Sequence, residues 1–412
     1  YLGSRTPADL LGTESVTVTA GGTEQVSWTL DTAALDGTRD LIVVVDPENR
    51  LAELLERDNV ASRRLVVTPD WQRWHFRVQA EVVNGPVEQE DVPVAVAAEF
   101  GGLLRRQGGA GALDPNSIRV CERGDDGAPG VAVPCQFDKA LGFDAEKNAS
   151  GEVAWVVPGK LAAGETRRFT VFFDTVANGP KSPAPGQIWN AVEQTANGQT
   201  YSAALDDGCV TGVTAQSPDG PGKRFLASLV YSSKQTGWVT EEEGQVLSQE
   251  VLSNGPVRAT VKVRKKLRGD LTYEKTYTFY PNRLDVRFSA DKAYGSFSRA
   301  YYGAEGTFAD SAGNTAQVDG KGDAEGVSGK CPAPKYYVVY APDWAHSCVA
   351  LGQYTNVGYW DSGASWGGIS LSGGDQAGAS LSYVFHRGQP NAAFGNTDHA
   401  RLTSPPTAKL VE

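Results

Sequence analysis

The sequence contains no methionine, only four histidines, and no apolar run long enough to cross a membrane. It also lacks a phosphate-cradling loop and a dinucleotide fingerprint, which excludes the common nucleotide-binding classes. Its 38 basic and 49 acidic side chains give a net charge of −11, so no broad nucleic-acid surface is expected. The five cysteines include no Cys-x-x-Cys pair and the histidines show no metal-binding spacing. We therefore expect neither a metal site nor a cofactor.

What the sequence does contain is alternation of apolar and polar residues, the pattern of half-buried strands. It recurs at residues 16–18, 26–30, 94–96, 257–263 and 284–288. The turn signal Asn-Gly-Pro occurs three times, beginning at residues 84, 178 and 254. Many short strands separated by such turns predict an all-β fold of sandwiches or barrels. Helices are expected only at residues 50–57 and 100–106.

The 412 residues are enough for about three domains. The first unit is expected at residues 1–69 and the second, a β-sandwich, at residues 70–176. The third is expected at residues 177–412 as one large antiparallel β-sandwich. It should include a hairpin in which residues 272–280 pair with residues 284–288.

The first unit carries a specific pattern after the apolar residues 41–45, which read as a buried strand. This pattern resembles the last strands of the CARDB domain, a bacterial cell-adhesion-related module with an Ig-like sandwich. The matching residues are Asp46, Pro47, Asn49, Glu53, Glu56 and Asn59. Asp58 and Val60 depart from the family's pattern. The resemblance implies a partial sandwich, because such a domain has strands before the point where this chain begins. Those strands lie in a longer precursor, or another subunit supplies them by pairing with an open sheet edge near residues 16–30.

Two pairs of cysteines flank short segments that read as strands or hairpins. Cys121 and Cys135 lie on either side of a Gly-rich loop, and Cys331 and Cys348 on either side of residues 336–340. We weigh two disulfides, with Cys209 left over, against five reduced and buried thiols. A disulfide would stabilise each segment by about 3 kcal/mol and would indicate an oxidising, extracellular setting.

The second and third units resemble parts of polysaccharide-degrading proteins. Residues 114–120, 134–138 and 161–169 resemble a β-sandwich module found beside catalytic domains in secreted proteins of that class. Residues 255–263 are similar, mainly in strand pattern, to the galactose-mutarotase-like supersandwich, a scaffold of polysaccharide lyases and several glycosidases.

A lyase on uronic-acid polymers needs a cation to stabilise an enolate-like intermediate and a base to take a proton. The candidates are Arg258, Tyr277, His346 and His386. Arg258 begins a basic stripe that continues with Lys262, Arg264, Lys265, Lys266 and Arg268. The alternatives are hydrogen-bonded histidines without a catalytic role, and a solvated strand face paired with Glu274 and Asp285.

Aromatic residues in the C-terminal part are candidates for sugar stacking. They are Tyr354, Tyr359, Trp360 and Trp366, which lie among Gly, Asn, Asp and Ser. Exposed rings would bind glycans, whereas buried rings would form a core cluster beneath the turns. The acidic run at residues 241–243 is expected to be a solvated turn.

These patterns predict an extracellular or cell-surface bacterial protein with a structural or adhesive role, contacting glycans or neighbouring subunits. The alternative is a polysaccharide-cleaving enzyme, a lyase on uronic-acid polymers or a glycosidase. The sequence leaves open whether the chain is an enzyme at all.

Overall fold

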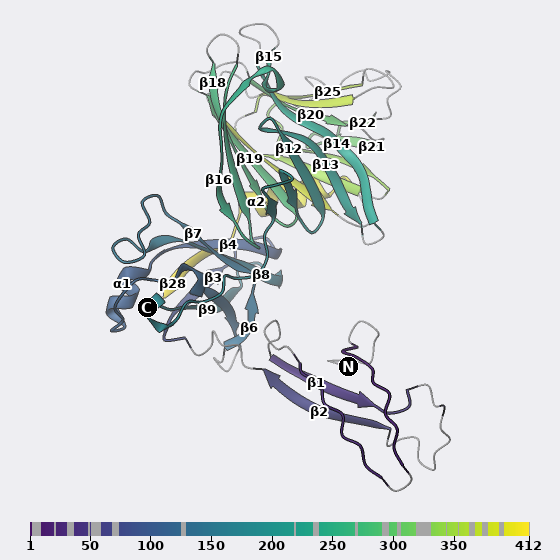
Figure 1. Ribbon diagram of the computed structural model, residues 1–412. Coiled ribbons are helices and arrows are strands. Elements are labelled where there is room, and N and C mark those ends of the chain that lie inside the picture. Colours follow the sequence, from purple (N-terminus) through teal and green to yellow (C-terminus); the bar gives the residue numbers. More distant parts are fainter. Residues whose placement is uncertain are drawn as a thin grey trace.

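The structure, a computed structural model, describes a large part of the chain. The described residues are 1, 10–19, 22–30, 37–47, 50, 59–67, 74–124, 129–217, 220–233, 239–267, 271–290, 296–302, 306–318, 331–342, 344–352, 354–361, 367–372, 378–386 and 391–411. Strands dominate them, which confirms the all-β fold (Figure 1). Their α-helices are α1 (Phe100–Arg106), as predicted, and α2 (Phe394–Thr403). Neither described helix is long and apolar enough to span a membrane. Residues 51–58, which hold most of the other expected helix, lie outside the described set.

The N-terminal part forms an antiparallel ribbon of β1 (Gly37–Val44) and β2 (Val60–Val67). The expected strands at residues 16–18 and 26–30 are not found, and Val16 and Trp28 are 51% and 59% exposed. The run at residues 41–45 also differs from expectation, because Val43 and Val45 are exposed. Among the described residues no second layer packs on this ribbon, and a two-stranded ribbon alone cannot bury alternating side chains.

The middle unit is a β-sandwich with the core between its sheets. One sheet has the order β28 (Thr407–Val411), β3 (Phe76–Val83), β9 (Thr166–Phe173), β5 (Arg119–Arg123) and β6 (Pro129–Val133). The other has the order β4 (Gln89–Glu99), β8 (Ser150–Leu161) and β7 (Cys135–Lys139). Phe100 of α1, Trp155 and Phe169 are fully buried in this core.

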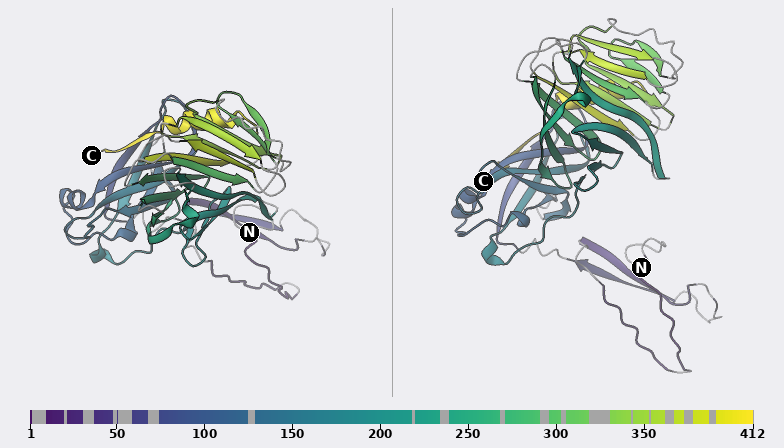
Figure 2. Two further views of the ribbon diagram at one scale, coloured as in Figure 1. Left: turned by 90° about the horizontal axis from the view of Figure 1, so that it is seen from above. Right: turned by 45° about the horizontal axis from the view of Figure 1, so that its top comes forward.

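The C-terminal strand belongs to this middle sandwich. β28 pairs antiparallel with β3, and Figures 1 and 2 show it lying across the middle unit. The structure therefore differs from the expected division at residues 177–412, because the chain returns to the middle unit for its last strand. Just before β28, the backbone carbonyls of Arg401 and Ser404 accept hydrogen bonds from the Gln89 side chain at 3.1 and 3.2 Å.

The large unit is built from two nine-stranded sheets of described residues. The first has the path β10 (Trp189–Asn190), β11 (Thr195–Asn197), β12 (Tyr201–Asp206), β13 (Cys209–Ser217), β14 (Gly220–Ser233), β20 (Ser296–Tyr302), β26 (Gly367–Ser372) and β25 (Asn356–Asp361), with β15 (Val239–Thr240) paired to β14. The second has the order β16 (Gln245–Asn254), β17 (Ala259–Lys266), β18 (Thr272–Phe279), β19 (Arg283–Ala290), β27 (Gly378–His386), β24 (Trp344–Ala350), β23 (Tyr336–Ala341), β21 (Gly306–Asp310) and β22 (Thr315–Val318). The predicted hairpin is confirmed as β18 and β19.

One hydrophobic core lies between these two sheets. Aromatic pairs join them across the core, with ring centroids 4.3 to 5.7 Å apart: Trp189 with Phe279, Tyr201 with Phe385, and Tyr359 with Phe308. α2 covers part of the second sheet. A Cβ at Gly395 would lie 2.2 Å from the ring of Tyr336, so glycine permits this close approach.

The large unit also contacts the middle unit directly, just before β17. The Gln136 side-chain oxygen accepts hydrogen bonds from the backbone N–H groups of Val257 and Arg258 at 3.0 and 2.9 Å. The Arg258 guanidinium donates to Asp138 at 2.6 and 2.8 Å and also to Glu152. Asp138 and Glu152 are directly opposite each other on β7 and β8, so one guanidinium neutralises both.

Candidate functional site

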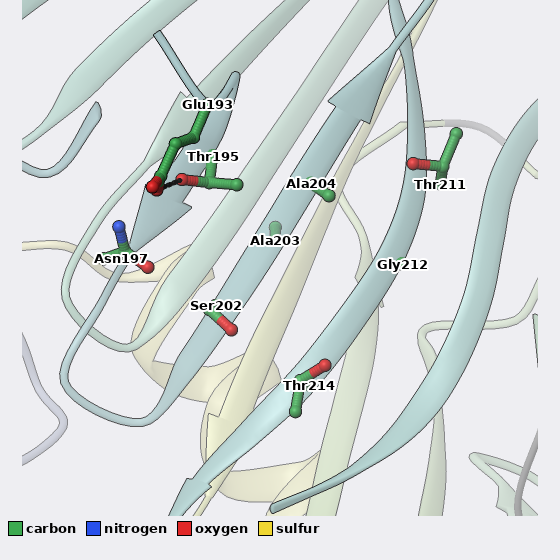
Figure 3. A pocket seen from close by; sticks show the side chains of 9 residues that line it. All are labelled: Glu193, Thr195, Asn197, Ser202, Ala203, Ala204, Thr211, Gly212 and Thr214. Carbon is green, nitrogen blue, oxygen red and sulfur yellow. Dashed lines mark hydrogen bonds between the residues drawn. The ribbon is translucent and has the colours of Figure 1, made fainter. Parts of the chain in front are cut away.

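The outer face of the first large sheet carries a trough with a volume of about 360 Å³ (Figure 3). Such a volume lies within the range of small-molecule sites, about 300–1,000 Å³. Its lining residues come from β11, β12, β13 and the turn before β11. They are Glu193, Thr195, Asn197, Ser202, Ala203, Ala204, Thr211, Gly212 and Thr214.

Two cross-strand rows of side chains form the trough. The register places Asn197, Ser202 and Thr214 in one row, and Thr195, Ala204 and Gly212 in the next. The first row offers an amide and two hydroxyls. The second row ends in alanine and glycine, whose small side chains leave the surface of the sheet low at that point. The three strands span about 10 Å from first to last, which sets the length of the trough across the sheet.

A β-bulge adds one more hydroxyl. The register shifts between Ala204 and Leu205, which leaves Thr211 as an extra residue between Val210 and Gly212 of β13. A bulge bends its strand and re-aims a side chain, and here Thr211 lines the trough.

Glu193 is the ionisable group among the lining residues that the structure describes. Its carboxylate accepts a hydrogen bond of 3.5 Å from the Thr195 hydroxyl, and Figure 3 shows the two side chains pointing toward one another. A pair of carboxylates for glycoside cleavage is not assembled from these lining residues. The trough suits binding of a ligand rich in hydroxyl groups.

His386 lies away from the trough, at the end of β27. One of its ring nitrogens, Nε2, lies 2.7 Å from the carboxylate of Asp398 on α2, and its ring stacks on Phe394 with centroids 4.1 Å apart. Ser347 donates to the same carboxylate. Serine and histidine thus both contact the aspartate, whereas a nucleophilic triad needs the histidine between the other two. The side chain of His386 is 19% exposed.

The other lyase candidates are not brought together with His386 in an open site. His346 is fully buried, and burial lowers its pKa to about 3. Tyr277 is fully buried too, its hydroxyl donates to the Gly208 carbonyl at 3.1 Å, and burial raises its pKa. Burial would lower the pKa of Arg258, but Asp138 and Glu152 outweigh it and raise the pKa. Arg258 therefore serves the contact between units, beside a hollow of about 550 Å³ that those two carboxylates line.

The basic stripe is split between the two faces of β17. Lys262 points outward and pairs with Glu274 at 2.8 Å. This pairing is the alternative to a catalytic role that the sequence left open. Lys265 points inward and is fully buried, because it occupies the same face as Val261 and Val263. Its ammonium donates to the Asp207 carbonyl at 2.7 Å.

Two of the four aromatic candidates for sugar stacking are core residues. Tyr354 and Tyr359 are only 4% and 2% exposed, so their rings pack inside the protein and do not form a surface platform. Trp360 lies on β25, and its side chain is outside the described set, as is the whole of Trp366. The interpretation as a buried cluster therefore holds for the two tyrosines.

The two expected disulfides are not formed. All five cysteines, Cys121, Cys135, Cys209, Cys331 and Cys348, are free and buried. Burial raises the pKa of Cys121 and of Cys209 to about 11 and that of Cys348 to about 12, so these thiols stay protonated. The argument from disulfides to an oxidising compartment therefore fails. Among the described residues, no three His, Cys, Asp or Glu side chains form a group that could hold a metal ion.

Sequence reasoning missed a buried polar cluster at one end of the large core. Glu241, expected in a solvated turn, is fully buried, and its carboxylate accepts from Lys275 Nζ and from the Tyr273 hydroxyl, both at 2.6 Å. Lys265 lies next to it, with Nζ 3.4 Å from the Cys209 sulfur. Burial, and then the charge of Glu241, raise the pKa of Tyr273. Within the described residues, Glu241, Lys275 and Tyr273 are almost fully buried, as in a structural ion pair.

Comparison with known proteins finds similarity in structure only. No protein-family model matches it, and no curated protein matches it. It is similar to the structure of an alpha-mannosidase from Enterococcus faecalis V583, with 12% identity and a TM-score of 0.50, over 82% of this chain and 46% of that one. A protein of glycosyl hydrolase family 38 from Enterococcus faecalis has 12% identity and a TM-score of 0.49, over 82% and 47%. The chain thus spans less than half the length of these structures. The likeness to the first, at 12% identity, shows the fold alone.

Proposed function

We propose that the chain binds carbohydrate and that the trough is its binding site. The observation that carries this proposal is the lining, in which hydroxyl and amide side chains from three adjacent strands surround a floor of alanine and glycine. Hydroxyl and amide groups both donate and accept, and so do sugar hydroxyls. The likeness of the fold to an alpha-mannosidase supports a carbohydrate-related role.

The wider role that we propose is structural or adhesive, on a bacterial cell surface or in the secreted fraction. The CARDB-like pattern of residues 46–59 supports this role. The buried side chains at the junction of the units support it too, because they make a fixed body from the middle and large units.

The experiment is affinity electrophoresis of the full chain through gels that contain a panel of soluble polysaccharides. Retardation by at least one polymer is expected. Ala204→Trp fills the trough and should abolish the retardation. The matched control is Thr276→Trp, which places the same ring on an outward position of β18 in the other large sheet. Retardation by no polymer, or equal loss in both variants, would refute the proposal.

The second candidate is a polysaccharide-cleaving enzyme, a lyase on uronic-acid polymers or a glycosidase. The observation in its favour is His386, a candidate base whose side chain is 19% exposed and whose Nε2 lies 2.7 Å from the Asp398 carboxylate. An aspartate that holds one ring nitrogen leaves the other to act as a base. Incubation with anionic polysaccharides should then give an unsaturated product with near-ultraviolet absorbance, lost in His386→Ala. New reducing ends without that absorbance would indicate a glycosidase.

The β1–β2 ribbon supports a further proposal, a homo-oligomer formed by strand addition. Val43 and Val45 are exposed on one face, and Val60 is exposed on the other at 40%. A ribbon that is extended by strands at its open edges becomes a wider sheet, and such a sheet can bury these apolar residues against a second layer. Light scattering should therefore show an oligomer that Val43→Glu dissociates, and a monomeric wild-type chain would exclude it.

A further inference from the structure

We propose that the trough selects uncharged glycans and rejects uronic-acid polymers. This inference rests on the proposed carbohydrate binding and assigns the chemical class of its ligand. The resemblance to lyase scaffolds implies a uronic-acid substrate. The present inference excludes such a substrate from the trough.

The first ground is the sign of the charge at the trough. Glu193 is exposed in the turn that begins the trough, and the described lining residues include no lysine, arginine or histidine to balance it. The tip of the β12–β13 hairpin lies beyond the lining residues and carries the exposed Asp206 and Asp207, but the Asp207 carboxylate pairs with Lys265 at 3.2 Å. Lys265 reaches that tip from the other sheet and offsets the charge of Asp207, so the charge at the trough itself is that of Glu193. A uronate in the trough would therefore meet like charge.

The second ground is hydrogen-bonding capacity. A carboxylate only accepts hydrogen bonds, whereas a sugar hydroxyl also donates. Glu193 therefore complements a hydroxyl and opposes a uronate, since two acceptors would face each other with no proton between them. The remaining polar groups, such as Asn197 and Ser202, can satisfy a hydroxyl in either sense. An uncharged ligand thus leaves fewer polar groups without partners, and unpaired polar groups are costly to cover.

The test uses one polymer in two states of charge. A uronic-acid polysaccharide and its carboxyl-reduced form share linkage and length, and they differ only in the carboxyl groups. Affinity electrophoresis at low ionic strength should show binding to the reduced form that is at least about fivefold tighter, the effect of one like-charge contact near 4 Å in water. The difference should shrink as salt is added.

Two variants locate the effect. Glu193→Lys, in an exposed turn, should reverse the preference, and Glu193→Gln should remove most of it. Glu146→Lys is the matched control, because it makes the same charge change in an exposed turn of the middle unit. It should leave the preference unchanged.

The outcomes separate the two proposals. If the wild-type chain binds neither form and no neutral polysaccharide, carbohydrate binding itself is refuted. If it binds and prefers the anionic form, or binds both equally, the chain contacts carbohydrate but the assigned class is wrong. If Glu146→Lys changes the preference as much as Glu193→Lys, net charge and not the trough decides it, which also overturns the inference.

Discussion

Replacement of Lys275 by methionine should strongly destabilise the large unit. Lys275 and Glu241 form an ion pair of 2.6 Å in which the two side chains are 4% and 0% exposed. Methionine fills the space of the lysine stem but leaves the Glu241 carboxylate buried, with the Tyr273 hydroxyl as a donor. Breaking a buried pair by removal of one partner costs about 3–5 kcal/mol, far more than an exposed pair. For a unit of this size, such a loss lowers Tm by about 6–20 °C.

The assay is urea unfolding followed by tryptophan fluorescence, because Trp189 and Trp344 lie in the core of the large unit. A double-mutant cycle with Glu241→Gln isolates the pair. Each single variant should be destabilised, and Glu241→Gln/Lys275→Met should recover much of the loss, because two neutral groups then replace two charges. Lys262→Met is the control, since its pair with Glu274 is 38% exposed on each side and should change stability by less than about 1 kcal/mol. If Lys275→Met and Lys262→Met have equal effects, burial does not control the strength of these pairs and the reasoning fails.

Three further predictions follow from buried groups. The pKa of His346 is lowered to about 3 in the folded chain. Between pH 6 and pH 3 the unfolded chain therefore binds a proton at this histidine and the folded chain does not, so the free energy of unfolding should fall by about 1.4 kcal/mol per pH unit as the pH is lowered. Denaturation at several pH values should show this slope, and His346→Gln should lessen it; an unchanged slope would assign it to other groups. The five free thiols should react with a thiol reagent only after denaturation, and a reductant should leave the native Tm unchanged; fewer than five reactive thiols would reveal a disulfide. Arg258→Met should lower the stability of the junction by about 2 kcal/mol, and calorimetric unfolding should then show two transitions. The control is Arg264→Met, at an exposed position, which should leave one transition. A single transition for both variants would show that Arg258 does not couple the units.

Alternation along the chain predicted the large unit well, because the period of two holds wherever two sheets face each other. Residues 272–280 illustrate this, since Tyr273, Tyr277 and Phe279 all point into the core. The same rule places Lys275 inward, between two tyrosines. A lysine on the apolar side of a strand must find an anion, so the pattern contained an unused signal for a buried carboxylate partner. The partner itself, Glu241, was hidden in an acidic run that reads as solvated.

The trough could not be predicted, because it depends on register. Ser202 and Ala204 are visible as outward positions of a strand, but their neighbours Thr214 and Gly212 are set by cross-strand pairing. The bulge at Thr211 moves that pairing by one residue, and a shift of one residue exchanges the two faces of a strand. Long-range pairing hid the role of Arg258 as well, because its carboxylate partners are more than a hundred residues away in the sequence.

The large unit, which carries the trough, is connected to the middle sandwich at both of its ends. The large unit leaves the middle sandwich after β9 and returns to it through α2 and β28, so it is an insertion with both ends attached to one body. The contact of Arg258 with Asp138 and Glu152 adds a third attachment that is not a chain connection. Three separate attachments fix orientation, whereas a single linker leaves a unit free to rotate. The three attachments therefore hold the large unit, and the trough on its first sheet, in a fixed orientation on the middle sandwich.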